Sequence, residues 1–209
     1  MTFAQNAATD KEAYQKTITQ RADKIVAVLG ITDAAKLEKI RNVVRDQYSD
    51  LNDIYMVRDS KSKEIKSNTD DKALKDTAMA RLNRATDLQL TQLHAKYLRK
   101  LNAQLNPSQV EQVKDGMTYG VLPLTYKAYQ EQILTLNEGQ KKQILVWLTE
   151  AREKAMDAES SEKKHAWFGK YKGRINNYLS AQGYDLKKEG AEWEKRRKEA
   201  ASADQHSKN

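Results

Sequence analysis

HAWFGKYKGRINNYLSAQGYDL, residues 165–186, is the stretch from which the rest of the chain can be interpreted. If residues 161–182 are helical, the apolar residues of this stretch recur at three- and four-residue steps and fall on one face. They are Phe168, Tyr171, Ile175, Tyr178 and Leu179. An aromatic stripe at this spacing is typical of a helix that buries one side, so we expect Phe168, Ile175 and Leu179 in a core.

The same helical period continues on both sides of this stretch. Only two prolines and eight glycines interrupt 209 residues, and residues with high helix propensity predominate. The sequence therefore predicts an all-α fold, an irregular antiparallel bundle of about six to seven helices. We expect a polar, mobile connection at residues 59–70 and an apolar loop at residues 116–124. Helical segments are expected at about 10–29, 34–59, 71–105, 107–115, 126–134, 138–159, 161–182 and 186–201, of which 107–115 and 126–134 are short.

The length of the chain favours a single helical domain, which we place at residues 10–201. Residues 1–9 resemble a disordered remnant of an export signal, or a start made around its cleavage site, with the apolar region missing. We therefore expect a secreted or periplasmic protein. Residues 202–209 are expected to be a frayed C-terminal tail.

The charge of the chain permits anionic partners. The net charge is +8, of which residues 160–209 carry +5. A basic balance suits acidic glycans as well as nucleic acids. No nucleic-acid motif and no single basic stripe accompany it, so we expect no nucleic-acid partner. No apolar run reaches the roughly 18 residues of a membrane span, so none is expected.

The sequence lacks the usual catalytic and metal-binding motifs. There is no cysteine, no HExxH, no GxSxG and no glycine-rich phosphate loop. The histidines, His94, His165 and His206, are isolated from one another. We expect no metal, no cofactor and no catalytic residue. An enzyme stays open as an alternative, because paired carboxylates that meet only in space leave no spacing signal.

Two glycines make the 165–186 stretch unusual for a helix. Gly169 and Gly173 lie four residues apart, on one side, and each costs roughly 1 kcal/mol relative to alanine. Close approach of another helix, or of the 116–124 loop, would explain them. An exposed backbone surface that receives a ligand would explain them equally. Of the two, we favour packing.

The polar residues of the same stretch suit sugar binding. Adjacent asparagines are unfavourable inside a helix, yet an amide both donates to and accepts from hydroxyl groups, and an arginine donates in a fixed fork. An aromatic face packs on the C–H side of a sugar ring. A solvated helix face is the simpler interpretation. The candidate ligand-binding residues are Trp167, Lys170, Tyr171, Arg174, Asn176, Asn177, Tyr184 and Trp193.

The 165–186 stretch also resembles a signature of a secreted Bacteroidetes family, domain of unknown function 3826. The likeness extends over most of residues 15–200 and includes Lys127-Ala-Tyr and the run LTEAREKAMDA that begins at Leu148. The resemblance implies export, an association with polysaccharide use, and a sugar-binding role. A fainter similarity, to periplasmic helical chaperones of the Spy type, rests on Leu105-Asn-Pro-Ser-Gln and Leu136-Asn-Glu-Gly-Gln, which carry Asn where those chaperones carry Thr.

These observations lead to one leading functional hypothesis and two alternatives. We expect an exported, non-catalytic accessory protein that binds an oligosaccharide or polysaccharide, acidic glycans included. The first alternative is a periplasmic helical chaperone or structural partner that uses apolar helix faces. The second is a polysaccharide-acting enzyme. The sequence does not indicate an oligomeric state.

Overall fold

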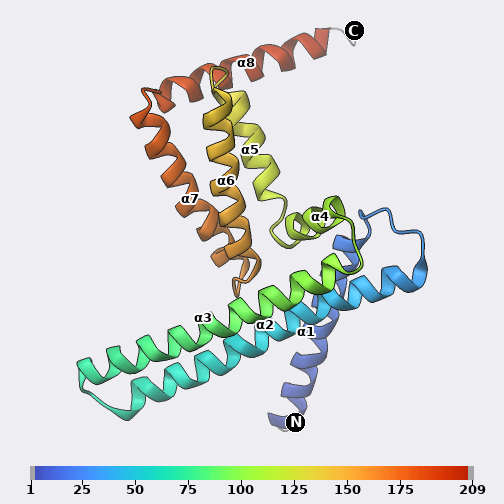
Figure 1. The fold of residues 1–209 in the computed structure, drawn as a ribbon, viewed down its shortest axis with the longest axis vertical. Coiled ribbons are helices and arrows are strands. Elements are labelled where there is room, and N and C mark those ends of the chain that lie inside the picture. Colours follow the sequence, from blue (N-terminus) through green and yellow to red (C-terminus); the bar gives the residue numbers. More distant parts are fainter. Residues whose placement is uncertain (1–2, 207–209) are drawn as a thin grey trace. The chain divides into compact units, whose positions relative to one another are not determined.

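The computed structural model describes the backbone of residues 3–206 and the side chains of residues 11–202. Its described part contains eight α-helices and no strand (Figure 1), which confirms the all-α prediction and adds one helix to the expected range. The helices are α1 (Phe3–Val26), α2 (Ala34–Asn68), α3 (Lys72–Asn102), α4 (Pro107–Met117), α5 (Val121–Gln132), α6 (Glu138–Met156), α7 (Ser161–Ala181) and α8 (Leu186–His206).

The chain forms two compact units. Unit 1 comprises Met1–Met117 with Asp157–Glu159, and unit 2 comprises Thr118–Met156 with Ser160–Asn209. Compactness alone does not decide whether two units fold together, so the single domain at 10–201 stays a prediction. The remnant at 1–9 and the tail at 202–209 fall partly outside the described residues and also stay predictions. The described helices α1 and α8 begin and end closer to the termini than we expected.

Unit 1 is built on the antiparallel pair α2 and α3 (Figure 1). Helix α1 packs on α2, and α4 packs on α1 and α3. Ile18, Ile40 and Leu101 are completely buried at the centre of these contacts. The segment 157–159 also belongs to unit 1, where the Tyr55 hydroxyl donates to the Asp157 carbonyl at 2.6 Å.

Two connections are shorter than the sequence predicted. The polar stretch 59–70 is not a mobile connection, because α2 continues to Asn68. This end of α2 packs along α3, where the Ser62 hydroxyl contacts the Met79 sulfur at 3.7 Å, so tertiary packing outweighs weak local propensity. The 116–124 loop is reduced to residues 118–120, because Pro123 falls in the first turn of α5, where its missing N–H costs no hydrogen bond.

The starts of α6, α7 and α8 are capped by side chains that stand just before each helix. Asn137 and Gln140 exchange hydrogen bonds at the start of α6, with the Asn137 Oδ1 accepting from the Gln140 N–H at 2.9 Å and the Gln140 Oε1 accepting from the Asn137 N–H at 3.0 Å. This arrangement is a capping box, which satisfies two otherwise free donors. Ser160 and Asp185 cap α7 and α8 in the simpler, one-sided way.

Unit 2 places α6 between its neighbours. Both α5 and α7 pack on α6, and α8 lies across their ends and contacts α5 and α7 (Figure 1). Arg196 of α8 donates to the last carbonyls of α5, those of Glu131 and Gln132, at 2.8 and 3.2 Å. The core of unit 2 contains Ile144, Leu148, Ala151, Ala155, Phe168, Ile175 and Leu179, none of them more than 1% exposed.

Candidate functional site

Helix α7 carries a buried stripe with a different surface on each side of it. Phe168, Ile175 and Leu179 are 1%, 0% and 0% exposed, as the sequence predicted. At 100° per residue, the aromatic and basic residues that begin at Trp167 lie on one flank of this stripe, and Lys172 and Asn176 lie on the other. The two flanks are therefore two separate candidate sites within unit 2.

The first flank combines with α6 into a partly exposed surface that we call the α6–α7 aromatic face. The tryptophan and tyrosine rings of this face are half-buried against the core of unit 2, while their outer parts stay accessible. Half-burial holds a ring in place and leaves polar atoms and one part of the ring for a ligand. The face consists of Trp147, Glu150, Trp167, Lys170, Tyr171, Arg174 and Tyr178.

Arg174 connects the two helices of the aromatic face. Its guanidinium carbon lies 4.6 Å from the centre of the Trp147 ring, and its Nη1 lies 3.6 Å from the Glu150 carboxylate. The Trp147 ring also meets Tyr178 edge to face, at a centroid distance of 5.2 Å. The side chains of Arg174 and Glu150 are 56% and 47% exposed. An aromatic ring, a cation and a carboxylate thus meet at one accessible place.

The other end of the aromatic face also pairs a cation with an aromatic ring, but without a carboxylate. The Lys170 ammonium lies 5.2 Å from the centre of the Trp167 ring. Between the two ends, partial burial and the neighbouring Glu150 carboxylate raise the pKa of Tyr171, so its hydroxyl remains a hydrogen-bond donor at neutral pH. The face is therefore a row of aromatic rings with exposed cations along it.

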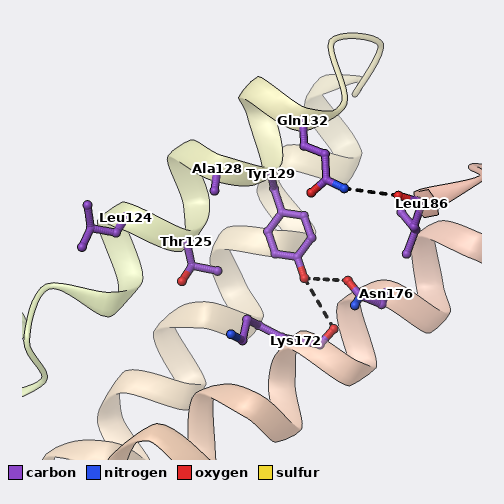
Figure 2. A pocket seen from close by; sticks show the side chains of 8 residues that line it. All are labelled: Leu124, Thr125, Ala128, Tyr129, Gln132, Lys172, Asn176 and Leu186. Atoms are coloured by element: carbon purple, nitrogen blue, oxygen red, sulfur yellow. Dashed lines mark hydrogen bonds between the residues drawn. The ribbon is translucent and has the colours of Figure 1, made fainter. Parts of the chain in front are cut away.

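The second flank of α7 lines a groove between α5 and α7 (Figure 2). Helices α5 and α7 both rest on α6, and Tyr129 reaches from α5 to α7. Its hydroxyl donates to the Asn176 Oδ1 at 2.7 Å. The groove has a volume of about 510 Å³ and is lined by Leu124, Thr125, Ala128, Tyr129, Gln132, Lys172, Asn176 and Leu186.

The tyrosine at the floor of the groove is held in its neutral form. Tyr129 is 7% exposed, and this burial raises its pKa to about 12. The neutral phenol of Tyr129 donates a hydrogen bond to the Asn176 amide oxygen. The amide NH₂ group of Asn176 remains a donor. At the other end of the groove, the Gln132 amide donates to the Leu186 carbonyl at 3.4 Å.

The two glycines of α7 do not serve close packing, and this interpretation of the sequence was wrong. A Cβ atom at Gly169 or Gly173 would meet nothing within 4 Å. Both positions lie on the outward side of α7, where no neighbouring helix approaches the backbone. Of the two explanations considered, the geometry agrees only with an exposed backbone.

The predicted site residues divide among four places. Trp167, Lys170, Tyr171 and Arg174 share the α6–α7 aromatic face, and Asn177 lies on the same side of α7 by its register. The others lie elsewhere in unit 2. Asn176 lines the groove, Tyr184 donates to the Thr135 carbonyl and the Gln140 amide beyond the end of α7, and Trp193 lies on α8 beneath Arg197.

Several residues at both sites were missing from the prediction. Trp147 and Glu150 lie three residues apart on α6, and that spacing is the only local sign that they share a face. Tyr129 and Gln132 stand at the same spacing on α5. None of these pairs could be assigned to α7 in advance, because helical register shows which face of a helix a residue occupies and not which helix that face meets.

The comparison with protein families agrees with the extent of the fold. The family described as "Protein of unknown function (DUF3826)" matches residues 15–199, from α1 to α8. The chain belongs to the DUF3826 family. No curated protein matches the sequence. As a member of DUF3826, the chain has both candidate sites inside the matched region.

Two further observations concern the described residues of this DUF3826 chain. None of their helices combines the length and the hydropathy needed to cross a bilayer. Among the same residues, no three His, Asp or Glu side chains gather closely enough to hold a metal ion.

Proposed function

We propose that this DUF3826 protein binds carbohydrate through the α6–α7 aromatic face, as a non-catalytic accessory protein. The observation that carries the proposal is the meeting of Trp147, Arg174 and Glu150 across two helices. The ring can pack on the C–H side of a sugar. The guanidinium donates to sugar oxygens, and the carboxylate accepts from sugar hydroxyls.

The cations above the rings do not prevent this binding. Lys170 and Arg174 are exposed, and a cation over a ring at an exposed site contributes only about 0.5–1 kcal/mol. A sugar ring can therefore displace either side chain and keep it as a hydrogen-bond donor at the edge. Trp147 and Trp167, one near each end of the face, suit an oligosaccharide or polysaccharide better than a single sugar unit.

The biological setting is part of the same proposal. We propose a secreted or periplasmic protein of a polysaccharide-use system, with a Bacteroidetes source, as the family resemblance implies. Fractionation of cells that express the full-length gene tests the location. Recovery in the cytoplasm would contradict the proposed export and leave the sugar-binding proposal standing.

Calorimetric titration with a panel of neutral and acidic oligosaccharides tests the proposed function. For a glycan that binds, we expect Trp147→Ala and Trp167→Ala each to weaken affinity at least roughly tenfold, because each removes a ring from the face. Trp193→Ala serves as the matched control, since Trp193 lies on α8 and outside the face. Far-UV circular dichroism should show that all three variants remain helical.

A partner protein is the second candidate for the same face. Trp, Tyr and Arg are enriched in protein interfaces, and Val146, next to Trp147 on α6, is 43% exposed. In that case no glycan releases heat, and the protein suppresses aggregation of an unfolding client. Loss of this suppression in Trp147→Ala, with no response to the panel, would replace carbohydrate binding with a chaperone or structural role.

A further inference from the structure

The groove between α5 and α7 is a second site, independent of the aromatic face. We propose that it binds a short saccharide whose units carry a carboxylate, such as a uronic acid disaccharide. The inference that the ligand is a saccharide rests on the carbohydrate-binding function proposed above. The carboxylate is inferred from the groove alone.

The groove exists because two helices share one neighbour. Both α5 and α7 pack on α6, and the space between them is spanned by the hydrogen bond from the Tyr129 hydroxyl to Asn176 (Figure 2). This bond ties α5 to α7 across the groove, and the Gln132 amide of α5 donates to the Leu186 carbonyl at the start of α8. The resulting volume of about 510 Å³ falls within the roughly 300–1,000 Å³ of small-ligand sites.

The groups that line the groove favour an anion. Lys172 contributes an ammonium, and no described carboxylate pairs with it. No Asp or Glu lines the groove. A carboxylate fits a lone ammonium with amide and hydroxyl donors beside it, because charge-assisted hydrogen bonds are about twice as strong as neutral ones.

The donors around Lys172 are prepared for such a ligand. The Asn176 oxygen accepts from the Tyr129 hydroxyl, which orients the amide, and the Asn176 NH₂ group provides two donors. Because the pKa of Tyr129 is about 12, this arrangement persists throughout the physiological pH range. Figure 2 shows the Lys172 ammonium extending toward the Thr125 hydroxyl, which adds a donor from the opposite wall.

The rest of the lining suits the carbon skeleton of a sugar. Leu124, Ala128 and Leu186 provide apolar surface, and Leu124 is 67% exposed. The C–H side of a pyranose can cover this surface, while its hydroxyls reach Gln132 and Thr125. A simple inorganic anion would leave the apolar part of the groove uncovered. The combination of one cation, several neutral donors and an apolar wall therefore favours an acidic sugar.

Calorimetric titration with a galacturonic acid disaccharide, and with its neutral galactose counterpart, tests this inference. We expect the acidic disaccharide to bind more tightly and to weaken when salt is raised from about 20 to 200 mM, because screening reduces the interaction with Lys172. Lys172→Met keeps the apolar stem and removes the charge, and it should weaken binding about tenfold or more. Lys172→Arg should restore most of the affinity.

Lys142→Met is the matched control, because Lys142 is an exposed lysine of α6 that belongs to neither site. It should leave binding of the disaccharide unchanged, whereas Ala128→Leu, which fills the groove, should abolish it. Equal losses in Lys142→Met and Lys172→Met, or equal binding of both disaccharides, would overturn the inference. If the neutral glycan panel still depends on Trp147 while the acidic disaccharide releases no heat, the groove proposal alone fails. If no glycan binds at all, both proposals fail.

Discussion

At the scale of single residues, the glycines of α7 are the least expected feature. Gly169 and Gly173 have open space where a side chain would stand, whereas Gly116 of α4 does not, since a Cβ there would lie 2.9 Å from Ile25 Cγ1. All three glycines sit inside helices and none has a positive φ. Only Gly116 therefore has a packing reason to be glycine.

This difference predicts opposite effects of alanine. Gly169→Ala and Gly173→Ala should each raise the free energy of unfolding by about 1 kcal/mol, because alanine loses less backbone entropy in a helix. Gly116→Ala should lower it, because Ile25 must shift. Chemical denaturation followed by circular dichroism measures all three. Destabilisation by Gly173→Ala would show that the backbone there is closely approached in solution.

At the scale of elements, helix α6 organises unit 2. It contacts α5 on one side and α7 on the other, and it contributes Trp147 and Glu150 to the aromatic face. Its first turn is held by the capping box of Asn137 and Gln140. Gln140 also accepts from the Tyr184 hydroxyl, so the start of α6 is tied to the connection between α7 and α8.

The capping box gives a prediction for this element. Asn137→Ala should lower the free energy of unfolding by about 1 kcal/mol, because the Gln140 N–H loses its acceptor. Asn137→Asp keeps an acceptor at the same place and should retain most of the stability. Thermal and chemical unfolding of the two variants measure the difference. Equal stability of both with the parent protein would mean that the box does not contribute in solution.

At the scale of the whole molecule, the chain passes repeatedly between the two units. Residues 157–159 belong to unit 1 but stand in sequence between α6 and α7 of unit 2. Unfolding of unit 2 therefore releases a segment that unit 1 uses. This connectivity favours cooperative unfolding, as expected for the predicted single domain at 10–201.

The positions of the tryptophans make that cooperativity measurable. Trp147, Trp167 and Trp193 all lie in unit 2, so tryptophan fluorescence reports unit 2 alone, whereas far-UV circular dichroism reports the helices of both units. We expect the two signals to give the same midpoint in a denaturant titration. Two separated midpoints would show that the units unfold independently and would contradict the single domain.

The candidate sites show which site residues helical periodicity can predict and which it cannot. Trp167, Lys170, Tyr171 and Arg174 could be grouped in advance because they share one side of a single helix. The partners on α5 and α6 could not, since Tyr129 and Trp147 have no sequence pattern that names α7 as their neighbour. Local context also misled at 59–70, where packing against α3 extends a helix through a weak stretch.

The sequence by itself determined the all-α class, the starts of most helices and the buried stripe of α7. These features depend on residues within a few positions of one another, whose interactions follow from the 3.6-residue turn. Only the tertiary structure decided that the two flanks of α7 meet different neighbours, that Arg174 meets Trp147 and Glu150, and that a groove separates α5 from α7. Those features arise from contacts between distant segments, which depend on how whole helices pack.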